Sequence, residues 1–191
     1  MEIKVNTVYL ELTGKNQFIP KDGFRKRIEV REVENDIYIN FTLFAGVGLP
    51  WKWYSRLDWT MEQWDAYFSS GKVKTFLGFK GNKIIGYYEI EEDEDQNVEI
   101  KFFGLFPGFL GSGLGGMFLS HAVDSAFGMN ARRVWLHTCS NDSGSALKNY
   151  IDRGFKIFKE EEQVEYVPEK EEILKSISGF FERYISRFTK P

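Results

Sequence analysis

The feature that most constrains the fold of this chain is a glycine-rich turn at residues 105–116, called the glycine turn below. It follows the apolar run from Val98 to Phe106 and precedes a run with helical spacing, so we expect strand, turn and helix in that order. Glycines have no Cβ to shield the backbone N–H groups, and the start of a helix carries partial positive charge. The turn therefore predicts a site for a pyrophosphate group.

Composition limits the classes of protein to which the chain can belong. Its 191 residues are 42% hydrophobic and 17% aromatic, which is typical of a folded globular domain. The net charge of −3 argues against nucleic acid as the main partner. With one cysteine, Cys139, and two histidines, His121 and His137, the chain can form no internal disulfide, and we expect no metal site. We expect a cytoplasmic protein without a membrane segment, because no signal-peptide pattern and no long apolar run is present.

Hydrophobic periodicity along the chain predicts an α+β fold. Asp36 and Thr60 each stand where a side chain can cap the start of a helix. The Gly81-Asn82 pair predicts a tight hairpin turn between two strands. The expected elements are strands at 5–12 and 27–33, helices at 37–46 and 60–71, a three-strand antiparallel meander at 73–79, 83–90 and 98–106, a helix at 113–127, a strand at 133–138, a helix at 143–153, and a strand pair or one long bent strand at 155–167.

The segment after Pro168 predicts a strongly amphipathic helix. Its acidic and basic residues are nearly balanced, which argues against a helix that lies on a membrane. We expect it to pack on the domain itself or on a second copy of the chain, as in a homodimer. The predicted organisation is one domain at 1–167, with its core at 28–167 and a strand extension at 1–25, followed by the helix at 168–191.

Two kinds of ligand could use the glycine turn. The pattern Gly111-x-Gly113-x-x-Gly116 formally matches a dinucleotide fingerprint, which would indicate an oxidoreductase. However, a β-meander precedes the turn and only one β–α–β crossover follows, whereas a dinucleotide fold repeats such crossovers. Asp142, the acid at a tolerable distance for a ribose, lies in a run that reads better as a helix cap. We therefore favour a different pyrophosphate, that of coenzyme A.

Three segments together resemble the GCN5-related N-acetyltransferase (GNAT) family over about residues 28–167. They are Leu105-x-Pro107-x-x-Leu110-Gly111-x-Gly113-Leu114-Gly115, the strand from Arg133 to Thr138, and Ala146-Leu147-x-x-Tyr150-x-x-x-Gly154-Phe155. The runs Pro50-Trp51 and 135–140 also resemble a bacterial subgroup whose substrate is poorly defined. The resemblance implies a mixed, mostly antiparallel sheet with a central splayed strand pair and flanking helices. It also implies acetyl-CoA as co-substrate.

The resemblance implies how the cofactor would lie. The pantetheine arm would run beside Phe103 and Leu105, with a bulge at Gly104, and either Asn141 or Ser143 would contact it. Leu110 stands where the family usually has Arg or Gln, so a side-chain contact typically worth about 1–3 kcal/mol is missing. The pyrophosphate would bind the backbone N–H groups of Leu110, Gly111, Ser112, Gly113, Gly115 and Gly116. Asp142 or Ser143 is expected to cap the helix that follows.

The resemblance also implies catalytic residues. Tyr150 matches the tyrosine that protonates the departing thiolate, a role that fits a phenol with an ordinary pKa of about 10. A general base must take a proton from the acceptor amine, directly or through water. Three candidates stand on neighbouring strands: Glu99, Glu89 and His137. Cys139 is expected to be a small apolar filler, because direct transfer needs no nucleophilic residue.

The acceptor site is predicted at the early helices and their loop. Trp51, Trp53, Tyr54 and Trp59 concentrate there, with Glu89 as a further substrate-binding candidate. Aromatic walls suit an aromatic, apolar or cationic acceptor. The sequence thus predicts an N-acetyltransferase that transfers acetyl directly to an amine of a small molecule, peptide or protein. The alternative is an inactive acyl-CoA-binding or regulatory module, which the missing side chain at Leu110 motivates.

Overall fold

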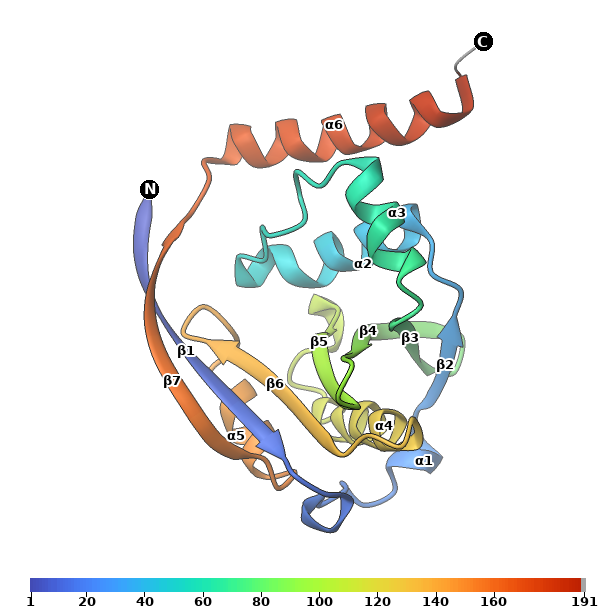
Figure 1. Cartoon of the computed structure of the whole chain (residues 1–191), viewed down its shortest axis with the longest axis vertical. Coiled ribbons are helices and arrows are strands. Elements are labelled where there is room, and N and C mark those ends of the chain that lie inside the picture. Colours follow the sequence, from blue (N-terminus) through green and yellow to red (C-terminus); the bar gives the residue numbers. More distant parts are fainter. Residues whose placement is uncertain (190–191) are drawn as a thin grey trace.

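A seven-stranded sheet organises the computed structural model, which describes residues 1–189 (Figure 1). The strand order is β2-β3-β4-β5-β6-β1-β7. Every neighbouring pair is antiparallel except β5 and β6, which are parallel. The strands are β1 (Glu2–Leu12), β2 (Glu29–Val33), β3 (Val73–Lys80), β4 (Lys83–Glu92), β5 (Asn97–Leu105), β6 (Arg133–Cys139) and β7 (Lys156–Tyr166).

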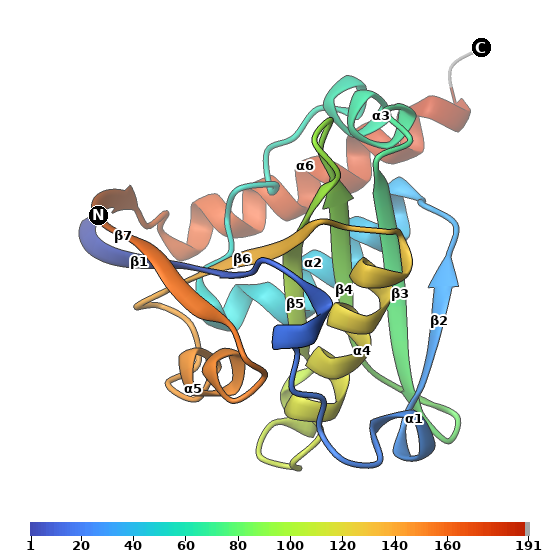
Figure 2. The ribbon, with the colours of Figure 1, turned by 60° about the horizontal axis from the view of Figure 1, so that its bottom comes forward.

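Helices cover both faces of the sheet, and Figure 2 shows α4 on one face with α2 and α6 on the other. Alternation along the strands produces this arrangement, because successive side chains point to opposite faces. Phe76 and Tyr88 belong to the core under α4, whereas Leu77 and Tyr87 belong to the core under α2 and α6. The helices and short 3₁₀ turns are η1 (Lys15–Gln17), α1 (Phe24–Arg27), α2 (Ile37–Gly48), η2 (Leu49–Trp51), α3 (Met61–Ser69), η3 (Pro107–Phe109), α4 (Gly115–Gly128), α5 (Ala146–Ile151) and α6 (Lys170–Thr189).

Side-chain caps begin two of these helices, as the sequence predicts. Asp36 accepts a hydrogen bond from the backbone N–H of Ile39 at the start of α2. Thr60 and Gln63 form a capping box at the start of α3. Each cap satisfies N–H groups that the first turn of a helix leaves without partners. The long helix after the glycine turn begins at Gly115, two residues later than expected.

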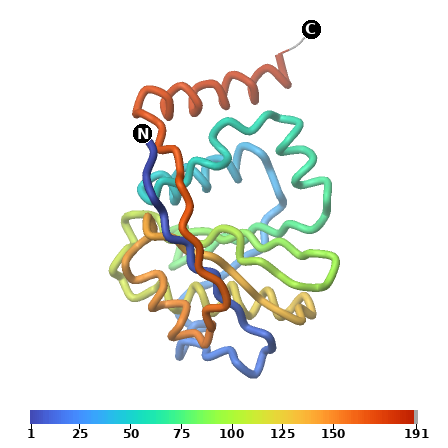
Figure 3. The backbone as a smooth tube through the Cα atoms, turned by 60° about the vertical axis from the view of Figure 1, so that its left-hand side comes forward, coloured from blue at the N-terminus to red at the C-terminus, as the bar shows by residue number. Residues whose placement is uncertain are grey.

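The N-terminal strand lies inside the sheet. β1 pairs with β6 on one side, where Tyr9 faces His137, and with β7 on the other, where Tyr9 faces Lys159. Figure 3 shows β1 and β7 running side by side over their whole length. The predicted strand extension is thus a strand between two others, and 155–167 forms one long strand with a register shift rather than a strand pair.

The predicted splay between the central strands is confirmed. β5 and β6 pair only where residues 97–99 face residues 133–135. Both strands continue beyond that point, β5 to Leu105 and β6 to Cys139. The edge of β5 that faces β6 therefore has no strand partner after Glu99.

The bulge in β5 lies earlier than expected. Glu89 of β4 pairs with Phe102, and the next pair along skips Lys101, which is the extra residue. Gly104 pairs in regular register, so the expectation of a bulge at Gly104 is wrong. A glycine is needed there for space, because a Cβ on Gly104 would lie 2.4 Å from Cγ1 of Val47 in α2.

The C-terminal helix packs on its own chain. Phe180 of α6 is fully buried and stacks on Phe41 of α2, with ring centroids 3.6 Å apart and planes 6° from parallel. The outer face of α6 keeps apolar side chains in solvent, such as Phe188. Burial and stacking of Phe180 stabilise the contact of α6 with the α2 face of the sheet.

Candidate active site

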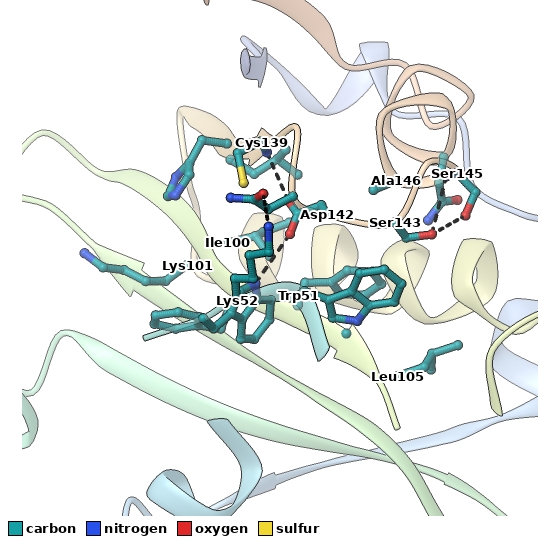
Figure 4. Close-up of a pocket in the computed structure, with 18 of the residues that line it drawn as sticks. Trp51, Lys52, Ile100, Lys101, Leu105, Cys139, Asp142, Ser143, Ser145 and Ala146 are labelled. Carbon is teal, nitrogen blue, oxygen red and sulfur yellow. Dashed lines mark hydrogen bonds between the residues drawn. The ribbon is translucent and has the colours of Figure 1, made fainter. Parts of the chain in front are cut away.

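A cleft of about 1020 Å³ runs along the splay between β5 and β6 and continues to α6. Figure 4 shows the region where strands, loops and helix starts converge on it. The fold brings every predicted cofactor-binding residue to its walls: Phe103, Leu105, Leu110, Gly111, Ser112, Gly113, Gly115, Gly116, Asn141 and Ser143. Tyr150, His137 and the aromatic residues Trp51, Trp53 and Tyr54 line the same cleft.

Glycines shape the cofactor end of this cleft. Gly111 and Gly113 have φ angles of 71° and 75°, a region that side chains disfavour. Neither of their amides makes a backbone hydrogen bond within residues 1–189. Gly115 and Gly116 lie in the first turn of α4, where amides have no intrahelical acceptor. A Cβ on Gly111 or Gly113 would meet nothing within 4 Å, whereas a Cβ on Gly116 would lie 2.7 Å from Arg153 Nη1. All four glycines line the cleft, so a pyrophosphate can approach their backbone closely.

Two backbone amides of the glycine turn are less available to a pyrophosphate than the sequence suggests. The N–H of Leu110 donates to the carbonyl of Pro107 at 3.2 Å, and that of Ser112 donates to Phe109 at 3.4 Å. Both bonds stabilise the turn itself. The Leu110 side chain is 45% exposed and adds no polar group. The amides of Gly111, Gly113, Gly115 and Gly116, called the glycine cradle below, are therefore the donors proposed for a pyrophosphate.

The loop between β6 and α5 forms the opposite wall. Asn141 accepts a hydrogen bond from Lys52 Nζ at 3.1 Å, and the hydroxyl of Ser143 shares a hydrogen bond with that of Ser145. Ser145 is the N-cap of α5 and makes no side-chain cap bond. Ser143 Oγ accepts a hydrogen bond from the backbone N–H of Ser145 at 3.4 Å, just before the first residue of α5, whereas Asp142 accepts from the end of β6. Both predicted pantetheine contacts still face the cleft.

Tyr150 lines the cleft from α5. It is 7% exposed and packs edge-on against Phe103, with ring centroids 6.4 Å apart. Burial raises its pKa well above the ordinary phenol value, and the charges of Asp142 and Cys139 raise it further. Tyr150 is therefore protonated at neutral pH and can donate a hydrogen bond. A raised pKa also makes complete proton transfer to a thiolate less favourable than hydrogen-bond donation.

His137 and Glu99 form a pair across the splayed strands. The structure places His137 Nδ1 3.2 Å from Glu99 Oε1, and Lys101 Nζ lies 3.4 Å from Glu99 Oε2. His137 is half-exposed in the cleft, whereas Glu99 is buried and does not line the cleft. A carboxylate this close favours a ring orientation with Nδ1 toward Glu99 and Nε2 away from it.

Glu89 has a different position from the one expected of a base or substrate ligand. It is fully buried and does not line the cleft. Arg56 Nη1 lies 2.8 Å from its Oε2, and Asn40 and Tyr67 also donate to its carboxylate. Its carboxylate oxygens are occupied by these donors and have no access to the cleft, so Glu89 is not placed to contact a substrate. Its contacts indicate that it anchors Arg56.

The acceptor end is lined by more of the chain than the aromatic loop, defined here as residues 51–59. Trp51, Trp53 and Tyr54 line it as predicted, but Trp59 instead covers the Arg56 guanidinium at 4.7 Å and does not reach the cleft. Sequence reasoning missed the residues that β1, β7 and α6 contribute, because only the strand order brings these distant segments together. They are Thr7, Tyr9, Gln163, Glu165, Tyr166, Pro168, Glu172 and Ser176.

The described residues also bear on thiol reactivity, metal binding and membrane spans. Burial raises the pKa of the Cys139 thiol, which favours the neutral, weakly nucleophilic form. Residues 1–189 contain no group of three or more His, Cys, Asp or Glu side chains placed to hold a metal ion. Across the same residues, no helix combines the length and apolar character needed to cross a membrane.

A sequence model of the acetyltransferase (GNAT) family matches residues 29–155. The match spans the meander, the splayed strands, the glycine turn and Tyr150, so the splay and the glycine cradle occur where such a fold has them. The chain belongs to this family. A comparison with curated proteins finds no match.

Solved structures with the same fold include three bacterial acetyltransferases. A GCN5-related N-acetyltransferase from Sphaerobacter thermophilus has a TM-score of 0.63 and 14% identity, over 86% of this chain and 52% of that one. An acetyltransferase from Bacillus subtilis in complex with CoA has a TM-score of 0.54 and 18% identity, over 69% and 78%. A GNAT family acetyltransferase from Elizabethkingia anophelis with acetyl-CoA bound has a TM-score of 0.54 and 22% identity, over 70% and 79%. The chain thus spans about half the length of the Sphaerobacter protein.

Proposed function

We propose that this protein is an N-acetyltransferase that transfers acetyl from acetyl-CoA directly to an amine of a small molecule, peptide or protein. One observation carries the proposal. The glycines of the turn, Tyr150, His137 and the aromatic loop all line a single cleft. The CoA and acetyl-CoA in the Bacillus subtilis and Elizabethkingia anophelis structures support the choice of cofactor.

The cofactor end supplies binding through backbone groups. The glycine amides would hold the pyrophosphate, and the open edge of β5 at Phe103 and Leu105 would hydrogen-bond the pantetheine. Asn141 or Ser143 would contact the same arm from the β6–α5 loop. Backbone donors of this kind are fixed before the ligand arrives, so little ordering is needed on binding.

Transfer needs one proton acceptor and one hydrogen-bond donor. His137, oriented by Glu99, takes a proton from the acceptor ammonium and leaves a neutral amine. The amine nitrogen forms a bond to the thioester carbonyl carbon, the carbon–sulfur bond breaks, and the second proton on the nitrogen passes to the departing thiolate, which leaves as the free thiol of CoA. Tyr150 donates a hydrogen bond to the departing sulfur, which stabilises the developing thiolate. Holding both reactants in one cleft supplies much of the rate enhancement.

Calorimetry with acetyl-CoA and CoA, followed by a CoA-release assay over a broad amine panel, tests the proposal. We expect binding of both nucleotides and turnover with at least one amine. His137→Gln should lower kcat by about 100-fold and leave acetyl-CoA affinity unchanged, since general-base catalysis typically contributes about 10²–10⁴-fold. Absence of nucleotide binding at high micromolar concentration would refute the function.

A second candidate is an acyl-CoA-binding or regulatory module without turnover. The exposed apolar side chain of Leu110 favours it, because the cradle has no side-chain donor at that position. Binding of acetyl-CoA with no product from any amine would select this candidate. An oxidoreductase is disfavoured, since β5 and β6 are the only parallel pair among the described strands.

A further inference from the structure

Two side-chain hydrogen bonds cross the cleft where strand pairing between β5 and β6 has stopped. Trp53 Nε1 donates to Asp142 Oδ1 at 3.4 Å, and Lys52 Nζ donates to Asn141 Oδ1 at 3.1 Å. Figure 4 shows Lys52 reaching toward the loop that carries Asp142. The donors belong to the aromatic loop on the acceptor side, and the acceptors belong to the β6–α5 loop on the cofactor side.

Close packing against α2 and β5 holds the Trp53 ring in place. A Cβ on Gly48 would lie 2.3 Å from Trp53 Cε3, so the ring lies directly on the end of α2. Phe102 of β5 packs against the same ring, with centroids 5.2 Å apart. Lys52, the residue before it, has a φ of 60°, an unusual backbone conformation for a side chain. A ring held so closely has one orientation, and its N–H points toward Asp142.

Asp142 is fixed from the opposite wall. Its Oδ2 accepts hydrogen bonds from Thr138 Oγ1 at 2.7 Å and from the backbone N–H of Cys139 at 3.1 Å. Both donors lie at the end of β6, directly after His137. The other oxygen, Oδ1, is the one that Trp53 contacts. One carboxylate therefore joins the end of the strand that carries His137 to the loop that lines the acceptor end.

We propose that Asp142 is a positioning residue that, through Trp53, fixes the aromatic loop relative to the reacting centre. The inference rests on the acetyltransferase function proposed above and concerns the geometry of the same site. Asp142 sets the distance between the acceptor wall and the thioester without contacting the acceptor. A displaced loop would weaken acceptor binding and leave the glycine cradle intact, because the cradle is built from other residues.

Trp53→Phe tests this directly, since it keeps an aromatic ring and removes the N–H donor. We expect the acceptor KM to rise about five-fold, in line with the loss of one hydrogen bond, while the Kd for acetyl-CoA stays within about two-fold. Trp59→Phe is the matched control: it lies in the same loop, does not line the cleft and should leave the acceptor KM unchanged. Asp142→Ala should reproduce Trp53→Phe, and Asp142→Asn, which keeps an acceptor oxygen, should recover part of the loss.

The double variant Trp53→Phe/Asp142→Ala decides whether the two residues act through each other. We expect its acceptor KM to match that of either single variant, because both remove the same contact. Fully additive effects, or an equal loss of acetyl-CoA affinity, would overturn the proposal.

A second measurement separates this inference from the proposed function. Amide hydrogen exchange over residues 51–58 should be faster in Asp142→Ala and Trp53→Phe than in the wild type, whether or not an acceptor is known. Unchanged exchange would overturn the positioning role even in an active enzyme. Faster exchange in a protein that acetylates no amine would instead refute the function.

Discussion

The two ends of the cleft are built in different ways. The proposed cofactor end uses backbone amides from one short stretch, the glycine turn, together with the β6–α5 loop, all within the matched residues 29–155. The proposed acceptor end uses side chains, and apart from the aromatic loop it draws on β1, β7 and α6, which lie outside that match. A backbone site depends on local conformation, whereas a side-chain site depends on which distant segments meet. The comparison predicts that changes at one end leave the other end unaffected.

The largest effect should follow a charge placed in the cradle. Gly113→Asp puts a carboxylate next to the pyrophosphate and a side chain on a residue with φ of 75°. We expect CoA affinity to fall by about 100-fold or more, from charge repulsion and backbone strain together. Calorimetry measures the loss. Gly108→Asp, in the same turn but outside the cleft lining and with free space around its Cβ, should bind CoA normally; a similar loss there would show that only net charge matters.

Tyr150→Phe tests the hydrogen bond that we propose Tyr150 donates to the departing sulfur. We expect kcat to fall about ten-fold with unchanged affinity for acetyl-CoA, because a hydrogen bond that strengthens in the transition state is removed. Burial raises the pKa of Tyr150, so the phenol keeps its proton as pH rises through its ordinary value of about 10. The wild-type pH–rate profile should therefore show no alkaline decline from Tyr150 below about pH 10. An unchanged kcat in the variant would remove Tyr150 from the mechanism.

Ser176→Phe probes the acceptor end alone. Ser176 lies on α6 and lines the cleft far from the glycine turn in sequence. A phenyl ring at this position should narrow the pocket and raise the KM for a bulky acceptor by about five-fold, with a smaller effect on a short amine. Steady-state kinetics with a short and a bulky amine make the comparison. A change in acetyl-CoA Kd would contradict the independence of the two ends.

Leu110→Arg should have the smallest effect and the opposite sign. Its side chain is exposed at the cleft, so an arginine there can reach a phosphate without displacing core residues. We expect CoA to bind about three- to ten-fold more tightly at low salt, with the gain reduced at high salt. Titration at two salt concentrations measures both. No gain would mean that the glycine amides already satisfy the pyrophosphate.

Local patterns predicted the parts of the molecule that local physics controls. The caps at Asp36 and Thr60, the glycine turn and the splay follow from short stretches of sequence or from the family resemblance. The sequence predicts a bulge at Gly104, which is wrong, since a glycine required for close packing and one required for backbone conformation look the same in a sequence. The sequence offers Glu89 as a base or substrate ligand, because nothing in its own strand reveals that Arg56 pairs with it.

The sequence by itself determined the order of elements and the site that backbone amides build, because glycine conformation and helix starts are set within a few residues. The tertiary structure alone decided that β1 lies between β6 and β7, that α6 lines the cleft and that Asp142 meets Trp53. Those contacts join residues far apart in the chain, and their energy is realised only when the sheet has formed. The glycine turn could therefore be interpreted from its own residues, whereas the acceptor wall required the complete fold.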